Sequence, residues 1–235
     1  MSEKGKEMKV VVIIPAYNEE SSIGKVINEI PKDLVGEIVV VNNNSTDSTA
    51  GVASAEGATV LLEEYLGYGA ACLKGIDYLK DKDFDIIIFL DGDYSDYPGE
   101  ISELIKPIIN DNIDMVIGSR TLGKSEKGAL PIQSRLGSII AGFLINFFWG
   151  VKYTDLGPFR AIKKDKLLAL NMSDKWYGWT VEMQIKAAKK SYAIKEVPVS
   201  YRKRIGKSKV TGTIKGTFLA SLIILKTIFA ELFKK

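Results

Sequence analysis

The sequence contains no histidine, and Cys72 is its only cysteine. A chain without histidine cannot form a Ser-His-Asp or Cys-His couple, nor a zinc site with histidine ligands. A single cysteine cannot form an internal disulfide, and because Cys72 stands among small residues in a helical pattern, we expect it to pack in the core. Any acid–base chemistry therefore falls to Asp, Glu, Lys or Tyr.

An excess of charge of either sign is also missing, since 32 Lys and Arg residues face 29 Asp and Glu residues. The resulting net charge of +3 argues against a nucleic-acid partner. The first eight residues are polar and charged, so we expect no signal peptide before the first strand. The hydrophobic share of 46% is ordinary for a globular chain that can bury a large core.

An unbroken apolar run, residues 86–90, ends in Asp91, Gly92 and Asp93. The run predicts a strand that is buried on both faces, as in the middle of a parallel sheet. Carboxylates at a strand end, separated by a glycine that lets the backbone approach a ligand, suit Mg²⁺ or Mn²⁺. Because such cations bind through one or two carboxylates and the phosphates of a substrate, the motif predicts a diphosphate ligand as well as a metal.

Strands and helices are expected to alternate over the first half of the chain. Apolar runs predict strands, and apolar residues at helical spacing predict helices between them. The alternation predicts an α/β fold with right-handed crossovers and a mostly parallel sheet that carries helices on both faces. The expected strands are residues 9–14, where Pro15 is expected to stop the strand, and residues 37–41, 58–62, 86–90 and 113–117.

Polar side chains follow four of these strands, in residues 15–19, 42–43, 91–93 and 118–120. Ligands bind outside the carboxyl ends of such strands, so the side chains predict a nucleotide site. No G-x-G-x-x-G motif follows the first strand, which disfavours a dinucleotide site. For the glycines of Gly67-Tyr68-Gly69, close packing of a helix on the sheet is the expected role.

Spaced motifs at residues 12–20, 40–47 and 90–93 resemble the family-2 glycosyltransferases of the GT-A fold. Residues 155–160 and 196–202 look like the polyprenyl-phosphate sugar synthases, the dolichyl-phosphate mannose or glucose group. The resemblance runs from about residue 9 to about residue 212. It implies a GT-A-type three-layer sandwich and a metal-dependent, inverting transfer of a hexose from a nucleotide sugar to a polyprenyl phosphate.

The resemblance also assigns roles to residues. It implies that Asp91 and Asp93 hold Mg²⁺ or Mn²⁺ and that Asp155 and Glu182 are catalytic acids near the sugar. It implies contacts to the nucleotide sugar from Pro15, Ala16, Tyr17, Glu19, Val41, Asn43, Asp91, Gly92, Asp93, Arg120, Arg204 and Lys209, among which Arg120, Arg204 and Lys209 reach phosphates.

The chain departs from the family pattern at Asn42 and Asn43, where many relatives carry two aspartates. An amide donates as well as accepts a hydrogen bond, so the base of the nucleotide stays open. The segment at residues 157–160 favours UDP-glucose over GDP-mannose as the donor.

The domain organisation follows from the same resemblance. We expect a disordered tail at residues 1–8 and a catalytic domain at residues 9–212. Within it, residues 9–120 form the nucleotide-binding half and residues 121–212 the acceptor half. Residues 213–235 are expected to form a C-terminal amphipathic helix near the membrane.

Two uncharged segments bear on the membrane. Residues 136–151 make a helix of about 24 Å, too short for a hydrocarbon core of about 30 Å, so we expect an interfacial or a core helix. Five cations lie within residues 202–209, just before the apolar C-terminal helix. They could meet an anionic leaflet, which predicts a peripheral protein on the cytoplasmic face, or bind the diphosphate. Trp176 and Trp179 could stack on a sugar, lie at the lipid boundary, or be buried.

Other functions remain open at this point. A phosphate acceptor is already anionic near neutral pH and needs no strong base, whereas a hydroxyl acceptor would need Asp155 or Glu182 as a base. A sugar-phosphate nucleotidyltransferase would want a glycine-rich, lysine-bearing loop after the first strand, which residues 15–17 are not. A non-catalytic nucleotide-binding module on a lipid surface is a further alternative. In the plainest alternative, Ser95 or Asp96 before Pro98 starts the next helix. The sugar, the prenyl length and the oligomeric state stay open.

Overall fold

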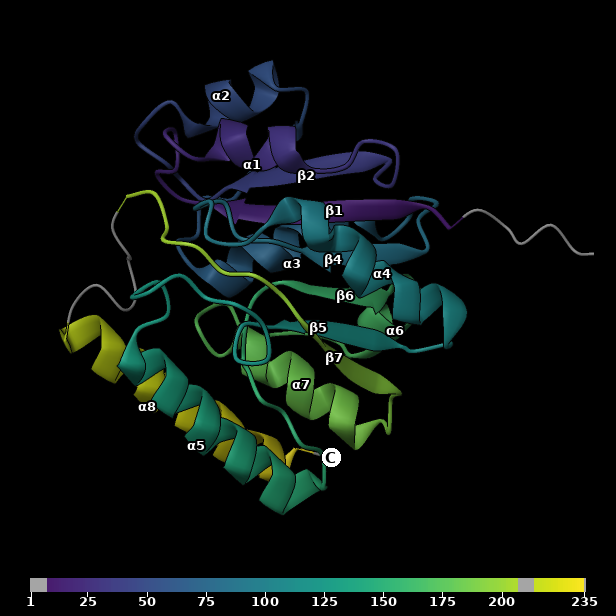
Figure 1. Ribbon diagram of the computed structural model, residues 1–235, viewed down its shortest axis with the longest axis vertical. Helices are drawn as coiled ribbons and strands as arrows, with labels where there is room; N and C mark the ends of the chain where they lie inside the picture. Colours follow the sequence, from purple (N-terminus) through teal and green to yellow (C-terminus); the bar gives the residue numbers. More distant parts are fainter. Residues whose placement is uncertain (1–7, 207–213, 235) are drawn as a thin grey trace, which may run out of the picture.

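The computed structural model describes residues 8–206 and 214–234 of the chain, so most of the expected N-terminal tail lies outside the described residues. One seven-stranded sheet runs through the molecule (Figure 1). The elements of the first half are β1 Val10–Ala16, α1 Ile23–Glu29, β2 Glu37–Asn42, α2 Thr49–Ala55, β3 Thr59–Leu62, α3 Tyr68–Leu79, β4 Ile86–Phe89, a 3₁₀ turn Pro98–Glu100, α4 Ile101–Asn110 and β5 Met115–Ser119. Those of the second half are α5 Ile132–Trp149, β6 Arg160–Lys163, α6 Lys164–Ala169, α7 Trp179–Lys189, β7 Ile194–Pro198 and α8 Ile214–Phe233.

The sheet has the strand order β3-β2-β1-β4-β6-β5-β7, and every neighbouring pair is parallel except the two that involve β6. The predicted mostly parallel sheet is therefore confirmed. The strict alternation ends after β5, because α5 leads into β6, which enters antiparallel between β4 and β5. The carboxyl ends of β1, β2, β4 and β5 still meet at one edge of the sheet, as parallel strands require.

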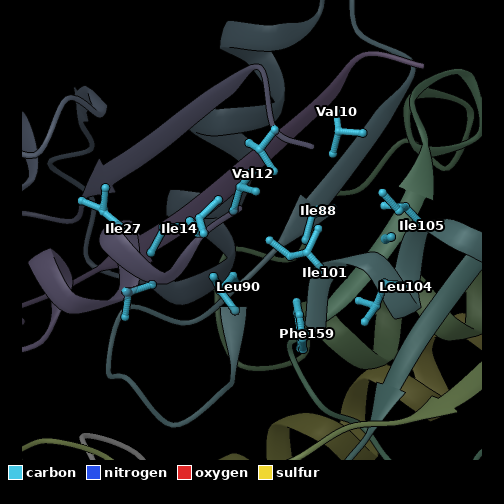
Figure 2. Close-up of a cluster of buried hydrophobic side chains, with 14 of the residues drawn as sticks. Val10, Val12, Ile14, Ile27, Ile88, Leu90, Ile101, Leu104, Ile105 and Phe159 are labelled. Atoms are coloured by element: carbon cyan, nitrogen blue, oxygen red, sulfur yellow. The ribbon is translucent and has the colours of Figure 1, made fainter. Parts of the chain in front are cut away.

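Each face of the sheet has its own apolar core. Val10, Val12 and Ile14 of β1 pack on one face against α1, α2 and α4, and Figure 2 shows part of this cluster. Val11 and Ile13 point to the other face, where α3, α5 and α7 contribute. Successive side chains of a strand point to opposite faces, so the apolar run of β1 fills both layers and produces the three-layer sandwich.

The first strand is longer than the sequence predicted, because Pro15 does not stop it. β1 pairs with β2 as far as Ala16, with Pro15 opposite Val41. Its pairing with β4 ends at Ile13. In a strand, the backbone groups of every second residue point to the same neighbouring strand. The backbone of Pro15 therefore points towards β4, like that of Ile13, but the pairing of β1 with β4 has already ended there. Pro15 has no N–H to donate, and none is needed at this position.

In the second half of the chain, α5 and α8 lie side by side and run in the same direction (Figure 1), and the ring centroids of Phe148 and Phe229 are 6.2 Å apart. Ser138, Ala141 and Ile145 bury one face of α5. Its other face is apolar and exposed, so α5 is a core helix on one side only. Within residues 8–206 and 214–234, no helix combines the length and hydropathy that a membrane crossing needs.

Candidate functional site

A cavity of about 430 Å³ opens at the carboxyl ends of the strands. β1 and the turn after it supply one side, the turn after β4 supplies the floor, and the loops before α3 and α7 supply the opposite wall. The lining residues are Pro15, Ala16, Tyr17, Glu19, Asn43, Leu66, Gly67, Tyr68, Asp91, Gly92, Asp93, Trp176, Tyr177 and Arg204.

The structure brings most of the predicted nucleotide-sugar residues together in this lining, but not all of them. Val41 is fully buried and its side chain packs in the core against Val39 and Ile13, so it does not reach the cavity. Val41 is still inside β2, where helices cover both faces of the sheet, whereas Asn43 lies past the end of the strand and lines the cavity. Lys209 lies outside the described residues.

The acid pair after β4 lies on the cavity floor. Asp93 accepts hydrogen bonds from the backbone N–H of Ser95 at 2.9 Å and from its hydroxyl at 2.5 Å, and its Oδ2 pairs with Nη2 of Arg204 at 2.8 Å. Asp91 Oδ1 is buried and has no hydrogen-bond partner among the described residues. Burial and the charge of Asp93 raise the pKa of Asp91 to about 7, although Arg204 and Arg120 oppose the shift.

These carboxylates fit a divalent cation. An unpaired buried carboxylate oxygen beside a second carboxylate offers the hard oxygen ligands that Mg²⁺ and Mn²⁺ prefer. Residues 8–206 and 214–234 contain no group of three or more Asp, Glu, Cys or His side chains able to hold an ion. A cation here would therefore complete its coordination with water or with the oxygens of a bound substrate.

Asp96 is a third acid at this turn. From the sequence, this residue was expected only as a possible start of the next helix. That alternative is wrong, because the 3₁₀ turn begins after Tyr97 without a side-chain cap. The carboxylate of Asp96 is 1% exposed, and neither oxygen has a hydrogen-bond partner among the described residues. Burial and the charges of Asp91 and Asp93 raise its pKa far above the ordinary value. The spacing of three acids in six residues was the available signal.

Arg120 and Asp155 pair with each other behind the cavity. Nε and Nη2 of Arg120 donate to the carboxylate of Asp155, both at 2.7 Å, and its backbone N–H adds a third bond at 2.9 Å. Burial raises the pKa of Asp155, but the charge and hydrogen bonds of Arg120 outweigh it and hold this pKa below its ordinary value. Neither residue is among the cavity-lining residues of the described chain, so the phosphate and sugar contacts expected of them stay predictions.

Glu182 also lies away from the cavity lining of the described chain, and its carboxylate holds a loop instead. It accepts hydrogen bonds from the backbone N–H and hydroxyl of Ser173 and from the N–H of Asp174, at 2.7 to 3.1 Å, and it pairs with Lys186 at 2.8 Å. The loop at residues 173–178 carries Trp176 and Tyr177 into the cavity wall. Glu182 therefore shapes the wall rather than touching the cavity.

Two glycines allow this loop to approach α3. A Cβ on Gly67 would lie 2.2 Å from the carbonyl oxygen of Lys175, and one on Gly69 would lie 2.1 Å from that of Asp174. The predicted packing of these glycines on the sheet is wrong, because their close partner is the loop before α7. Gly75 has that role instead, since its Cβ would meet the Ile13 side chain at 2.7 Å.

The two tryptophans of this region have different environments. Trp176 is 43% exposed at the cavity, with its ring 5.6 Å from that of Tyr65. Trp179 is fully buried against Phe89. The sugar-stacking and lipid-boundary alternatives therefore fail for Trp179, whereas the position of Trp176 leaves them open for that ring. Cys72 is fully buried, as predicted.

Asn43 fastens the opposite edge of the same wall. Its Nδ2 donates to the carbonyl oxygens of Glu63 at 3.1 Å and Tyr65 at 2.8 Å, and its Oδ1 accepts from the N–H of Gly67 at 2.8 Å. An aspartate could accept from Gly67 but could not donate to the two carbonyls. The amide that departs from the family pattern is therefore the group that this loop requires.

Residues 199–206, which we call the strap, cross the acidic turn. The N–H groups of Arg202 and Ile205 donate to the carbonyl oxygens of Ser95 and Asp93, both at 2.9 Å. The guanidinium of Arg202 lies 3.3 Å from the ring centroid of Tyr94 and pairs with Glu29 at 2.6 Å. The strap thus brings the Arg204 side chain to the cavity from the far end of the chain.

Comparisons with known proteins support the family that the motifs suggested. Residues 11–169 match the model of glycosyl transferase family 2. The chain belongs to this family. An uncharacterized glycosyltransferase of Mycobacterium tuberculosis is 32% identical over 221 residues, which are 93% of this chain and 97% of the relative. The dolichyl-phosphate hexose transferase of Haloferax volcanii is 30% identical over 217 residues, 92% of each chain. This family-2 chain is therefore a glycosyltransferase.

A solved structure confirms the GT-A-type fold. Glucosyl-3-phosphoglycerate synthase of Mycobacterium tuberculosis, in complex with Mn²⁺, UDP-glucose and phosphoglyceric acid, superposes with a TM-score of 0.77 at 23% identity. The match covers 95% of this chain and 79% of the synthase. At that identity the likeness establishes the fold and leaves substrates to be argued from the site.

The clamp at Asn43 can be tested by Asn43→Asp. The carboxylate would face the carbonyl oxygens of Glu63 and Tyr65 without a proton to donate, so we expect the free energy of unfolding to fall by about 1 to 3 kcal/mol. Urea denaturation measures this change. Asn42→Asp is the matched control, because among the described residues the Asn42 side chain acts as an acceptor, its Oδ1 binding the backbone N–H of Ser45 at 3.1 Å. Equal losses in both variants would show that the donors of Asn43 are unimportant.

The raised pKa of Asp91 predicts a pH-dependent stability. The folded metal-free protein keeps this proton up to about pH 7, whereas the unfolded chain releases it near the ordinary aspartate pKa of 3.8. The folded state binds more protons in this window, so the contribution of Asp91 falls with rising pH, by at most about 1.4 kcal/mol per pH unit. The stability of the wild type relative to Asp91→Asn, measured in urea without metal, is expected to fall across the window. Parallel stability curves would contradict the assignment.

Proposed function

We propose that this family-2 enzyme transfers a hexose, with inversion, from a nucleotide sugar to a polyprenyl phosphate. UDP-glucose is the favoured donor and GDP-mannose the alternative. The observation that carries the proposal is the cavity floor, where the unpaired oxygen of Asp91 lies beside Asp93 and Arg204. The name of the Haloferax volcanii relative, a dolichyl-phosphate hexose transferase, supports the acceptor class.

Asp91 and Asp93 would hold Mg²⁺ or Mn²⁺ together with the diphosphate of the donor. The bound cation would supply positive charge where negative charge develops on the leaving diphosphate. Arg204 adds a guanidinium at the same place, and Tyr17 and Pro15 offer surfaces for the nucleoside. The protein therefore contributes position and charge rather than a nucleophile.

A phosphate acceptor, unlike a hydroxyl acceptor, needs no catalytic base. A phosphate monoester has its second pKa near 6, so a polyprenyl phosphate is largely dianionic at neutral pH and can attack without losing a proton. Asp155 is bound by Arg120, and Glu182 is bound by Ser173 and Lys186, so neither carboxylate is free to take a proton from a substrate. This arrangement suits a phosphate acceptor better than a hydroxyl acceptor.

A hydroxyl acceptor is the second candidate. The structural neighbour, named glucosyl-3-phosphoglycerate synthase, was solved with UDP-glucose and phosphoglyceric acid, a small soluble molecule. An acceptor of that class would enter the same cavity and would need a base, which Asp155 could supply only after release from Arg120. The two candidates differ in where the transferred sugar is found.

The transfer can be assayed with labelled UDP-glucose and GDP-mannose, Mg²⁺ and membranes that contain polyprenyl phosphate. We expect label from UDP-glucose in the organic phase, lost by at least about a hundredfold in Asp93→Asn, where a charge that holds the cation is removed. Asp111→Asn is the control, because Asp111 is an exposed carboxylate directly after the C-terminal end of α4 and is not among the described cavity-lining residues. Label only in a soluble hydroxyl acceptor would overturn the acceptor proposal.

We further propose that the enzyme lies on the cytoplasmic face of a membrane through α5 and α8. Exposed apolar residues line one face of each helix, including Phe143 at 66% and Phe147 at 72% exposure. Faces of this kind favour an interfacial position. In Figure 1 both helices begin on the side where the strands of the cavity end, so a lipid acceptor could reach the cavity from that surface.

Flotation with anionic phospholipid vesicles tests the membrane proposal. Replacing Phe143 and Phe147 together by Ser is expected to weaken vesicle binding at least about tenfold, because a buried Phe contributes about 1.5 to 3 kcal/mol. Ile109→Ser is the control, since Ile109 is 51% exposed on α4, away from this surface. Unchanged flotation of the double variant would refute this membrane face.

A further inference from the structure

Arg204 occupies the place that a cation would need. Its Nη2 lies 2.8 Å from Oδ2 of Asp93 and 3.6 Å from Oε1 of Glu19. Its Nε is buried and has no hydrogen-bond partner among the described residues. One side of the guanidinium therefore holds the acid, and another side has a donor without an acceptor.

We propose that Arg204 is a built-in counter-ion of Asp93 that exchanges partners when substrate binds. It neutralises Asp93 while the metal is absent and turns to the diphosphate of the nucleotide when the metal takes its place. The inference rests on the proposed function, because it concerns the same metal and nucleotide. Its consequence is that metal alone binds weakly and that nucleotide strengthens metal binding.

Arg204 and a metal ion would compete for Oδ2 of Asp93. Mg²⁺ binds carboxylate oxygens at about 2.0 to 2.1 Å, so it cannot share Oδ2 of Asp93 with a guanidinium at 2.8 Å without strong repulsion between two cationic groups. A cation must therefore displace Arg204. Asp93 is nearly fully buried, so the displaced pair is one that solvent screens poorly.

The second step is where the displaced guanidinium goes. Arg204 is only 31% exposed in its side chain and would remain a largely buried, unpaired charge, which is costly. A diphosphate offers oxygens that an arginine binds in a bidentate manner, and the unpaired Nε adds a donor for it. Nucleotide thus removes the cost of displacement, and metal frees the arginine for the nucleotide.

The third step is that the side chain can move while the backbone stays. Arg202, two residues earlier, uses Nε on the carbonyl oxygen of Tyr94 at 2.7 Å and Nη2 on Glu29 at 2.6 Å. Ile205 donates its N–H to the carbonyl oxygen of Asp93. The strap is therefore fixed on both sides of Arg204, whose side chain forms ion pairs with Asp93 and Glu19.

The test is the affinity of the metal-free full chain for Mn²⁺ alone, by titration calorimetry or Mn²⁺ paramagnetic resonance, and then with UDP. In Arg204→Gln we expect Mn²⁺ alone to bind about tenfold tighter, within the range of typical coupling between sites, while UDP binds more weakly in the presence of Mn²⁺. UDP is therefore expected to increase the Mn²⁺ affinity of this variant by a smaller factor than that of the wild type. If Arg204 only contacted phosphate, Arg204→Gln would weaken UDP binding and would leave the affinity for Mn²⁺ alone unchanged.

Lys203→Gln is the matched control, since it removes an exposed positive charge from the neighbouring position of the strap. We expect its Mn²⁺ affinity to change by less than about twofold, because exposed charges are screened. Thermal unfolding checks that Arg204→Gln is folded, and Arg204→Met serves as a second variant if it is not.

Several outcomes would overturn the inference. Folded Arg204 variants whose affinity for Mn²⁺ alone is unchanged or weaker would show that no exchange occurs, and the proposed function would stand. Equal tightening in Lys203→Gln would show a general charge effect instead. A wild-type chain that binds neither Mn²⁺ nor UDP would remove the proposed function itself, and the inference with it.

Discussion

The structure depends on the repulsion among three carboxylates that are packed into one turn at the end of β4. Asp91, Asp93 and Asp96 lie within six residues; Asp93 and Asp96 are buried, and so is Oδ1 of the half-buried Asp91, so little water screens their charges. Each of the three carboxylates is stabilised in a different way. Burial and the charge of Asp93 raise the pKa of Asp91 to about 7, burial and the charges of Asp91 and Asp93 also raise the pKa of Asp96, and Asp93 is paired with Arg204. A site built in this way has a strong electrostatic demand for a cation.

The remainder of the chain is arranged to hold that turn open towards a cavity. The strap fastens it from one side, through Arg202 against Tyr94. The wall on the other side is fastened by Asn43 and Glu182, whose side chains bind loop backbone and leave Trp176 facing the cavity. Most polar groups around the cavity thus position loops, and few are left to meet a ligand. Asp91, with a carboxylate oxygen that has no partner among the described residues, and Arg204, with an Nε in the same state, are the groups that the proposed transfer would use.

The apolar surface and the cavity are linked through the interior of the second half. Ser138 of α5 donates its hydroxyl to Asp155 at 3.3 Å, and Asp155 holds Arg120, whose guanidinium lies 5.0 Å from the ring centroid of Tyr201 in the strap. The helix that exposes Phe143 and Phe147 therefore shares a polar connection with the segment that carries Arg204.

Sequence alone determined the features that depend on neighbours along the chain. The apolar run of β4, the acid pair that follows it and the alternation of strands and helices predicted the sheet and the edge where ligands bind, because periodicity and strand ends are local properties. The resemblance of the spaced motifs indicated the family. The same local reasoning placed Asn43 and Glu19 at the cavity. The same reasoning wrongly ended the first strand before Pro15. Whether a proline can stand there depends on how far the pairing of β1 with β4 extends, which is not a local property.

Tertiary structure alone decided what each polar group does. Val41 is buried within β2, Asp155 is held by Arg120, Glu182 is held by the 173–178 loop, and the buried carboxylate of Asp96 has no hydrogen-bond partner among the described residues. These outcomes arise from contacts between residues far apart in sequence, whose energies depend on burial and distance, and no pattern of nearby residues encodes them. The sequence determined which acids would meet at the sheet edge, and the packing of the second half of the chain determined which of them would remain free.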